Sequence, residues 1–409
     1  MSEKSPHQEW YDNVLFKDEH FAFQFVRRLG HATAQAADIG ECISVAKKII
    51  DGDIASWHNE WLLLANRMHT LAQDFQENGH LISAGETLMR AVNYYLAAEF
   101  YLIEKKDRKK RLAIWHQAND SFIKALRFLY PNDAITPIKI PYNNITIPGY
   151  FCKAENAKQL APLLIVHSGF DGTAMDTFWT TGLPAIKRGY HCLIFEGPGQ
   201  GEMIIRQNIP FRFDWEVPVK AVIDFAEQLP GVNKEKIALM GISFGGYLAP
   251  RAAAFEKRIK ACIANDGVID FAAPFYRFPQ EITDLIENNP NKFNAIIIEA
   301  MQTSIRAKFG FENAMWRFAQ ETPANLMKHI TGHSLKEVAR KITCPTLVID
   351  SEAENFFSGQ PKLLFNALEC PKTLLHFSRE DTAQAHCQVG ANMIASAKIF
   401  NWLDNWNAS

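Results

Sequence analysis

The sequence predicts an α/β fold, in which a mostly parallel, doubly wound sheet follows a helical N-terminal region. Apolar side chains in about the first 130 residues recur at helical spacing. Short apolar runs then alternate with helical stretches, as in a parallel sheet covered by helices on both faces. Between the two patterns, YPNDAITP at 130–137 carries two prolines and an Asn-Asp pair, which are typical of a domain boundary.

Residues 1–135 are expected to form a helical domain. Trp57, Trp61, Leu64 and Met68 fall at i, i+4, i+7 and i+11, which puts them on one face of a helix. The segment SAGETLMRAVNYYLAAEFYL repeats this spacing. The basic stretch KKDRKKR at 105–111 is expected to be a solvated helix face or turn.

Residues 136–409 are expected to form the sheet domain. An Asn-Asn turn divides IKIPYNNITIPGYFCKA into two β-rich pieces, which predicts a hairpin. A helical insertion at about 271–340 interrupts the alternation before the penultimate strand. The other expected strands are 162–167, 190–196, 236–240, 260–265, 345–350 and 373–377.

Composition and charge exclude several classes of protein. The 409 residues include 43 basic and 45 acidic side chains, and this net charge of −2 argues against nucleic-acid binding. The N-terminus lacks the apolar segment of a signal peptide, and no apolar run is long enough to cross a membrane. Seven scattered cysteines without a C-x-x-C pair favour a reducing compartment. We expect a cytoplasmic protein with no cofactor and no metal centre.

Aromatic residues are numerous, with 29 Phe, 9 Trp and 10 Tyr. Many of them fall in the N-terminal region and the insertion, including Trp57, Trp61, Tyr94, Tyr95, Phe275, Tyr276 and Trp316. They indicate either a large core or an aromatic-lined ligand pocket, and the sequence alone does not separate the two.

The strongest chemical signal is GISFGG at 241–246, between the expected strand KIALM and the helical YLAPRAAAFEKR. This is a G-x-S-x-G motif in a strand–turn–helix context, where the glycines allow a sharp turn that exposes the serine hydroxyl. The motif therefore predicts Ser243 as a nucleophile, in the arrangement known from α/β-hydrolases.

A nucleophilic serine needs a histidine base and an acid that orients the histidine. In the α/β-hydrolase arrangement the acid follows the serine along the chain, and the histidine follows the acid. His386 is the expected base because it follows the last strand, whereas His376 lies inside that strand. The acid should follow the strand PTLVID. The usual pattern there is H-G-x-x-D, whose aspartate position falls on Glu354. Asp350 and Glu352 are the alternatives, as is a Ser-His dyad beside three solvated carboxylates.

The oxyanion of a reacting carbonyl needs two backbone N–H donors. Phe244 is expected to supply one, because it follows the nucleophile, and Gly169 or Phe170 in VHSGFDG the other. FEGPGQGE at 195–202 is another glycine-rich turn. It lacks the lysine and spacing of a nucleotide-binding loop, so we expect a tight turn at the sheet edge.

Several segments together resemble one branch of the α/β-hydrolases. The segments are GISFGGYLAPRAAAFEKRIKACIANDG, FEGPGQGE, RFDWE, AHCQVGA and the N-terminal SAGETLMRAVNYYLAAEFYL. That branch includes dihydroxypseudooxynicotine hydrolase, fungal polyketide chain-shortening hydrolases and fermentation–respiration switch esterase-like proteins. The resemblance covers nearly the whole chain from about residue 55.

The resemblance implies Ser243 as nucleophile and His386 as base. It also implies an acid after PTLVID, where relatives usually carry aspartate and this chain has Glu354. Relatives use the N-terminal helices as a lid, which makes Arg90, Tyr94 and Tyr95 candidates for substrate binding; the alternative is that they pack within the helices. The relatives also suggest a homodimer.

The implied activity is cleavage of a C–C bond next to a ketone, or of an ester, in a small and aromatic or polyketide-like substrate. The alternative from another class is a non-catalytic regulatory or binding protein on a hydrolase scaffold, since fold does not fix function. An acylaminoacyl-peptidase-like hydrolase ranks third, because no β-propeller repeat precedes the sheet domain.

Overall fold

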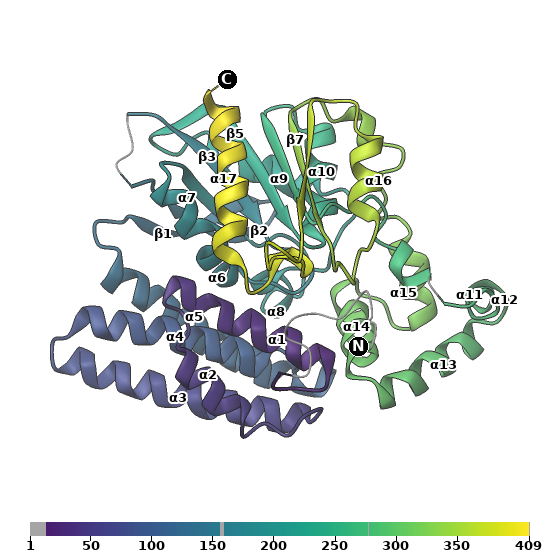
Figure 1. Ribbon diagram of the computed structural model, residues 1–409, viewed down its shortest axis with the longest axis horizontal. Helices are drawn as coiled ribbons and strands as arrows, with labels where there is room; N and C mark the ends of the chain where they lie inside the picture. Colours follow the sequence, from purple (N-terminus) through teal and green to yellow (C-terminus); the bar gives the residue numbers. More distant parts are fainter. Residues whose placement is uncertain (1–13, 156–158, 277, 409) are drawn as a thin grey trace.

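The computed structural model describes residues 14–155, 159–276 and 278–408. An eight-stranded sheet in the order β1-β2-β4-β3-β5-β6-β7-β8 lies at its centre (Figure 1). The β1–β2 hairpin pairs antiparallel with β4, and the remaining neighbours are parallel. The strands are β1 (Ile135–Tyr142), β2 (Ile145–Cys152), β3 (Ala161–His167), β4 (His191–Phe195), β5 (Val232–Ile242), β6 (Ala261–Asn265), β7 (Thr346–Ser351) and β8 (Lys372–Phe377).

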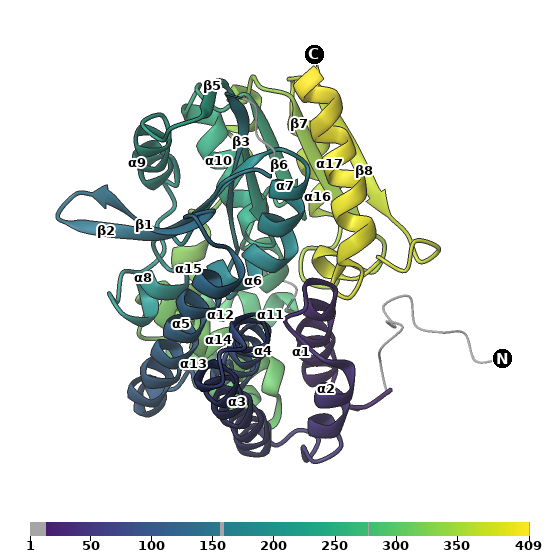
Figure 2. The same cartoon turned by 90° about the vertical axis from the view of Figure 1, so that its left-hand side faces the viewer.

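Helices cover both faces of this sheet, because the inner strands are apolar on both sides. In β3, Leu164 and Val166 face one core while Leu163 and Ile165 face the other. The first face packs against α6 (Ala174–Thr177), α7 (Leu183–Lys187) and α17 (Asn392–Ala408). The second packs against α8 (Gly201–Ile205), α9 (Glu216–Ala226), α10 (Gly245–Phe255) and α16 (Gln360–Ala367). The predicted doubly wound α/β fold is confirmed (Figure 2).

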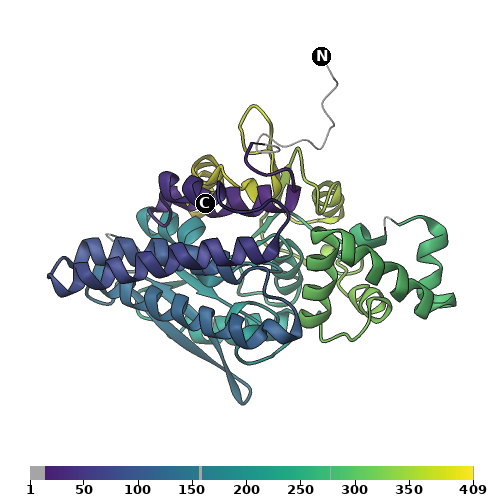
Figure 3. The same ribbon diagram turned by 90° about the horizontal axis from the view of Figure 1, so that it is seen from below.

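The N-terminal helices lie together at one end of the sheet (Figure 1). They are α1 (Glu19–Gly30), α2 (Ile39–Ala46), α3 (Ile54–Glu77), α4 (Leu81–Glu99) and α5 (Arg108–Leu129). The side chains of Asp18, Asp38 and Asp53 accept hydrogen bonds from the first turns of α1, α2 and α3 and fix where they begin. Figure 3 shows α3, α4 and α5 side by side.

The apolar face predicted on α3 is buried, and the Trp57 Nε1–H donates to the Ala97 carbonyl of α4 (2.9 Å). The basic stretch at 105–111 is only partly solvated, however. Arg111 is buried in an ion pair with Glu99, because its side chain faces α4 rather than water. Within the described ranges, none of the helices has a run apolar and long enough to cross a lipid bilayer.

The helices between β6 and β7 stand apart from the sheet, beside the N-terminal helices (Figure 3). They are α11 (Gln280–Thr283), α12 (Leu285–Asn288), α13 (Pro290–Thr303), α14 (Ile305–Arg317) and α15 (Pro323–Ile330), in the stretch where the sequence predicts a helical insertion. The aromatic rings of α14 reach back to the N-terminal helices, where Phe309 stacks on Phe100 at 4.6 Å between centroids.

Asp176 in α6 joins the N-terminal helices to the sheet domain. Its carboxylate lies 2.8 Å from Arg28 Nη1 and 3.2 Å from Arg27 Nη2, both on α1, and 3.1 Å from His31 Nε2. It also accepts the Thr173 N–H in a capping box. Burial opposes the charged form, but the two arginines hold the pKa of Asp176 well below its usual range. The carboxylate is therefore charged and fully paired.

We expect Asp176→Ala to destabilise the protein by about 3–5 kcal/mol, because it leaves the buried Arg28 without its partner. Urea unfolding followed by circular dichroism measures this loss. The matched control is Asp224→Ala, which removes the half-exposed partner of Lys220 and Arg258 and should cost under about 1 kcal/mol. Equal losses in the two variants would contradict a special role for Asp176 in holding α1.

Candidate active site

Ser243 lies in the sharp turn between β5 and α10, with a φ of 62° in the left-handed region. Its N–H donates to the Asn265 carbonyl at the end of β6, and its own carbonyl accepts from the Gly246 N–H (2.7 Å). These bonds hold a backbone conformation that a serine rarely adopts. The strained turn lifts the Ser243 hydroxyl out of the sheet edge and into a cavity.

His386 follows β8 on the loop before α17 and meets Ser243 from 143 residues away in the chain. Its Nε2 lies 2.8 Å from Ser243 Oγ, and its Nδ1 lies 2.6 Å from Glu354 Oε2. With Nδ1–H donating to the carboxylate, Nε2 is free to accept the serine proton. The three side chains form a continuous hydrogen-bond chain from hydroxyl to imidazole to carboxylate.

Glu354 lies on the loop after β7 and is buried. Its Oε1 accepts the N–H groups of Phe356 and Phe357, each at 2.7 Å, so the carboxylate is fixed before it meets His386. Burial favours the neutral acid, but the charge and hydrogen bond of His386 outweigh it and lower the pKa of Glu354 to about 2. Glu354 is therefore ionised at neutral pH.

The two alternative acids lie elsewhere. Asp350 Oδ2 lies 2.9 Å from Nδ1 of His376 on the neighbouring strand β8. Glu352 accepts the Arg379 N–H at 2.7 Å and pairs with its guanidinium at 3.2 Å. Of the three candidate carboxylates, the structure brings Glu354 to His386 and turns the other two away.

Asp266, for which the sequence predicts no role, also lies against His386. It follows β6, and its Oδ2 is 3.1 Å from His386 Nδ1. Burial and the nearby charge of Glu354 raise the pKa of Asp266 to about 6. One signal could have found it: an aspartate directly after the strand ACIAN stands at the same sheet edge as Ser243.

The loop after β3 passes close to the Ser243 turn. A Cβ on Gly169 would lie 2.6 Å from the Phe244 nitrogen and 2.9 Å from Ser243 Cβ, so this approach requires glycine. No acceptor among the described residues pairs with the N–H of Phe244 or Phe170. The Phe170 side chain lines the cavity, whereas the Phe244 ring is buried against Phe271 at 4.0 Å.

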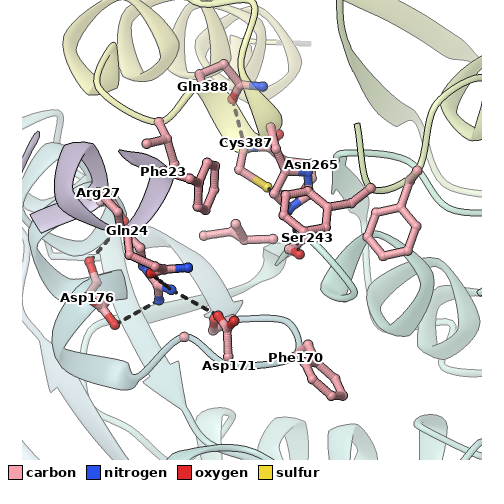
Figure 4. A pocket seen from close by; sticks show the side chains of 18 of the residues that line it. Phe23, Gln24, Arg27, Phe170, Asp171, Asp176, Ser243, Asn265, Cys387 and Gln388 are labelled. Atoms are coloured by element: carbon pink, nitrogen blue, oxygen red, sulfur yellow. Dashed lines mark hydrogen bonds and ion pairs between the residues drawn. The ribbon is translucent and has the colours of Figure 1, made fainter. Parts of the chain in front are cut away.

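A cavity of about 450 Å³ opens in front of Ser243 (Figure 4). Helix α1 supplies Phe23, Gln24 and Arg27 to its wall, and Arg27 Nη1 lies 3.0 Å from Asp171. The cavity has a polar side near this ion pair, further polar side chains that include Asn355 and Asn392, and an aromatic wall. The aromatic wall comprises Phe23, Phe170, Phe271, Phe275, Phe309, Phe311, Phe356, Phe357 and Phe400.

Comparison with known proteins identifies the family. A family model described as the alpha/beta hydrolase family matches residues 163–390, more than half of the chain. The chain belongs to the α/β-hydrolase family. Among curated proteins, 20-hydroxy-prefusarin hydrolase FUS2 of Gibberella moniliformis is 30% identical over 412 residues, covering 96% of this chain and 97% of that protein.

Hydrolase acrC of Aspergillus aculeatus is 29% identical over 417 residues, covering 95% of this chain and 97% of that protein. The crystal structure of 2,6-dihydroxy-pseudo-oxynicotine hydrolase shares the fold, with a TM-score of 0.70 at 21% identity over 92% of this chain and 94% of that one. These similarities confirm the branch of α/β-hydrolases that the sequence resembles.

Arg90, Tyr94 and Tyr95 of this α/β-hydrolase do not line the cavity, contrary to the expectation for substrate-binding residues. Helix α4 is buried between α3 and α5, so these side chains bond to neighbouring helices. The Tyr94 hydroxyl donates to Glu41 (2.7 Å), which also pairs with Arg90 (3.2 Å), and the Tyr95 hydroxyl donates to Asn66 (2.9 Å). These contacts fit the alternative, in which the three side chains pack within the N-terminal helices.

Cys387 also reaches the cavity, with its Sγ 3.4 Å from His386 Nε2. Burial raises the pKa of this thiol to about 11, so it is neutral at pH 7. Asp266, His386 and Cys387 offer ligand atoms within 4.8 Å of one another, a spacing that could hold a metal ion. Both nitrogens of His386 already face other partners, Ser243 and Glu354, so a metal there would displace one of these hydrogen bonds.

We expect Gly169→Ala to lower the free energy of unfolding by about 1–3 kcal/mol, because the added methyl overlaps the Ser243 turn. Chemical unfolding measures the change. Gly332→Ala is the matched control: its nearest neighbour would be the His329 carbonyl at 3.5 Å, an ordinary contact. An unchanged stability for Gly169→Ala would show that the loop after β3 can move away from Ser243.

Proposed function

We propose that this α/β-hydrolase is a serine hydrolase with Ser243 as nucleophile, His386 as general base and Glu354 as the acid that orients it. The observation that carries the proposal is the unbroken hydrogen-bond chain from Ser243 Oγ through both nitrogens of His386 to Glu354. A free serine hydroxyl is a weak nucleophile, and a base at this distance is what activates it.

In the proposed reaction, His386 accepts the Ser243 proton while Oγ attacks a substrate carbonyl. The N–H groups of Phe244 and Phe170 would stabilise the oxyanion, with Gly169 allowing their loops to approach. The resulting imidazolium protonates the leaving group, which is an alkoxide for an ester and a carbanion-like carbon for a ketone. Water then attacks the acyl-enzyme with His386 again as base and releases an acid.

The proposed substrates are small carbonyl compounds with an aromatic or polyketide-like body. A cavity of about 450 Å³ is in the range of ligand sites for such molecules. Its aromatic wall suits a flat apolar body, while the Arg27–Asp171 side offers both donors and acceptors to hydroxyl or keto groups. The relative named 20-hydroxy-prefusarin hydrolase also supports a substrate of this kind.

We further propose that residues 1–135 serve as the lid of a catalytic domain formed by residues 136–409. The support is that α1 supplies Phe23, Gln24 and Arg27 to the cavity opposite Ser243. Helices α2 to α5 act behind it as a scaffold, since none of their described residues lines the cavity. The α1 positions replace those on α4 as candidates for substrate binding.

We expect Ser243→Ala to lose fluorophosphonate labelling and to lose at least about 10³-fold of the hydrolysis of p-nitrophenyl esters and β-diketones. Labelling at the Ser243 peptide is read by mass spectrometry, and the two substrate classes separate ester from C–C cleavage. Ser44→Ala, at an exposed serine of α2, is the control and should match the wild type. Full activity of Ser243→Ala on every substrate would refute a serine mechanism, and an unlabelled wild type would favour a binding protein.

Phe23→Ala should raise KM for an aromatic p-nitrophenyl ester about 10-fold and change kcat little, because the ring contributes apolar contact but no proton transfer. Tyr95→Phe is the matched control, since its hydroxyl bonds to Asn66 outside the cavity. Steady-state kinetics of both variants distinguish α1 from α4 as the substrate-binding helix. A raised KM in Tyr95→Phe with none in Phe23→Ala would reverse this assignment.

A further inference from the structure

Two carboxylates meet the same edge of His386. Glu354 Oε2 lies 2.6 Å from Nδ1 and Asp266 Oδ2 lies 3.1 Å from the same atom. They come from different strands, Asp266 from the end of β6 and Glu354 from the loop after β7. An imidazole has one Nδ1–H to donate, so the proposed triad needs one carboxylate, Glu354, and assigns no role to Asp266.

Asp266 accepts hydrogen bonds at both of its carboxylate oxygens, which fix the side chain in place. Its side chain is fully buried, and its Oδ2 accepts the Cys387 N–H at 2.8 Å. Its Oδ1 accepts from the Ser351 hydroxyl at 3.0 Å and from the Gln388 side-chain amide at 3.4 Å. These donors come from β7 and from the His386 loop itself. The carboxylate therefore ties the loop that carries the base to the end of the sheet.

A second buried carboxylate is costly unless a positive charge faces it. Three titratable groups face the Asp266 carboxylate: the Glu354 carboxylate, the His386 imidazole and the Cys387 thiol. Its other partners, the Ser351 hydroxyl and the Gln388 amide, are neutral. His386 is the only cation among these groups, and it is positive only after it accepts a proton. The site is thus arranged to favour the imidazolium that forms during the reaction.

We propose that Asp266 is a second carboxylate partner of His386, a positioning residue that shares Nδ1–H with Glu354 and substitutes for Glu354 when that side chain is lost. The inference rests on the proposed serine mechanism. It gives the site two acids on one base, supplied by two adjacent strands.

The proposal predicts a shift in pH dependence that a purely structural role would not produce. His386 must be neutral to accept the Ser243 proton, so labelling increases as pH rises through the pKa of His386. Although burial opposes the charge, the carboxylates of Glu354 and Asp266 hold the pKa of His386 well above its usual range. Removing the Asp266 charge lowers the pKa of His386. The acidic limb of the curve of labelling rate against pH therefore moves to lower pH.

The experiment measures the rate of fluorophosphonate labelling of the full-length protein from pH 5 to 10. In that reaction Ser243 Oγ forms a bond to phosphorus, the P–F bond breaks, fluoride leaves and His386 takes the proton. We expect the acidic limb of Asp266→Asn to lie about one pH unit below that of the wild type. Asp350→Asn is the matched control, because it removes a buried carboxylate that pairs with His376 instead, and its limb should not move.

The single variant Glu354→Gln tests the proposal even if Asp266→Asn does not fold. Loss of the sole acid costs a triad about 10⁴-fold in turnover. We expect Glu354→Gln to lose only about 10-fold in labelling rate, because Asp266 keeps Nδ1–H in place, and Glu354→Gln/Asp266→Asn to lose about a further 100-fold. An unmoved limb in folded Asp266→Asn, or a Glu354→Gln as inactive as His386→Ala, overturns the role of Asp266. Neither result touches the proposed function, which fails if Ser243 of the wild type is not labelled or if Ser243→Ala keeps full hydrolysis.

Discussion

Three strand ends converge on one imidazole, and the candidate active site of this α/β-hydrolase depends on that convergence. Ser243 follows β5, Asp266 follows β6 and Glu354 follows β7, and all three lie within 3.1 Å of a nitrogen of His386. The contacts exist because β5, β6 and β7 are consecutive and parallel, so that their carboxyl ends open on the same side. A change in strand order would separate groups that are far apart in the chain.

The second half of the cavity depends on a different interaction, the buried ion pairs of Asp176. They attach α1 to α6 and so fix Phe23, Gln24 and Arg27 opposite Ser243 (Figure 4). The many aromatic residues of the sequence lie in two places. Trp57 and Trp61 fill the core of the N-terminal helices, whereas the cavity is lined by phenylalanines from α1, the strand-end loops, the insertion and α17.

The fold could be predicted because its signals are local. Each apolar run became a strand, and G-x-S-x-G marks its own turn, so Ser243 could be chosen as the candidate nucleophile without any knowledge of sheet order. Asp266 was missed because nothing in its neighbourhood distinguishes it from any aspartate after a strand, and only the β5–β6–β7 order brings it to His386. Arg90 and Tyr94 do not line the cavity because most of α4 after its first turn is buried against other helices, and its spacing does not say which side faces the cavity.

The origin of the cavity walls has a consequence for how such an enzyme diversifies. The proposed reacting groups follow strands of the sheet, whereas one part of the cavity wall comes from α1, more than 130 residues before the loop after β3. Exchanges at Phe23 or Gln24 can reshape the site while the Ser243–His386 geometry persists, provided that Arg28 keeps its contact with Asp176. Substitutions along α1 alone can thus change the shape of compound that the cavity accepts, while the Ser243–His386 pair stays the same.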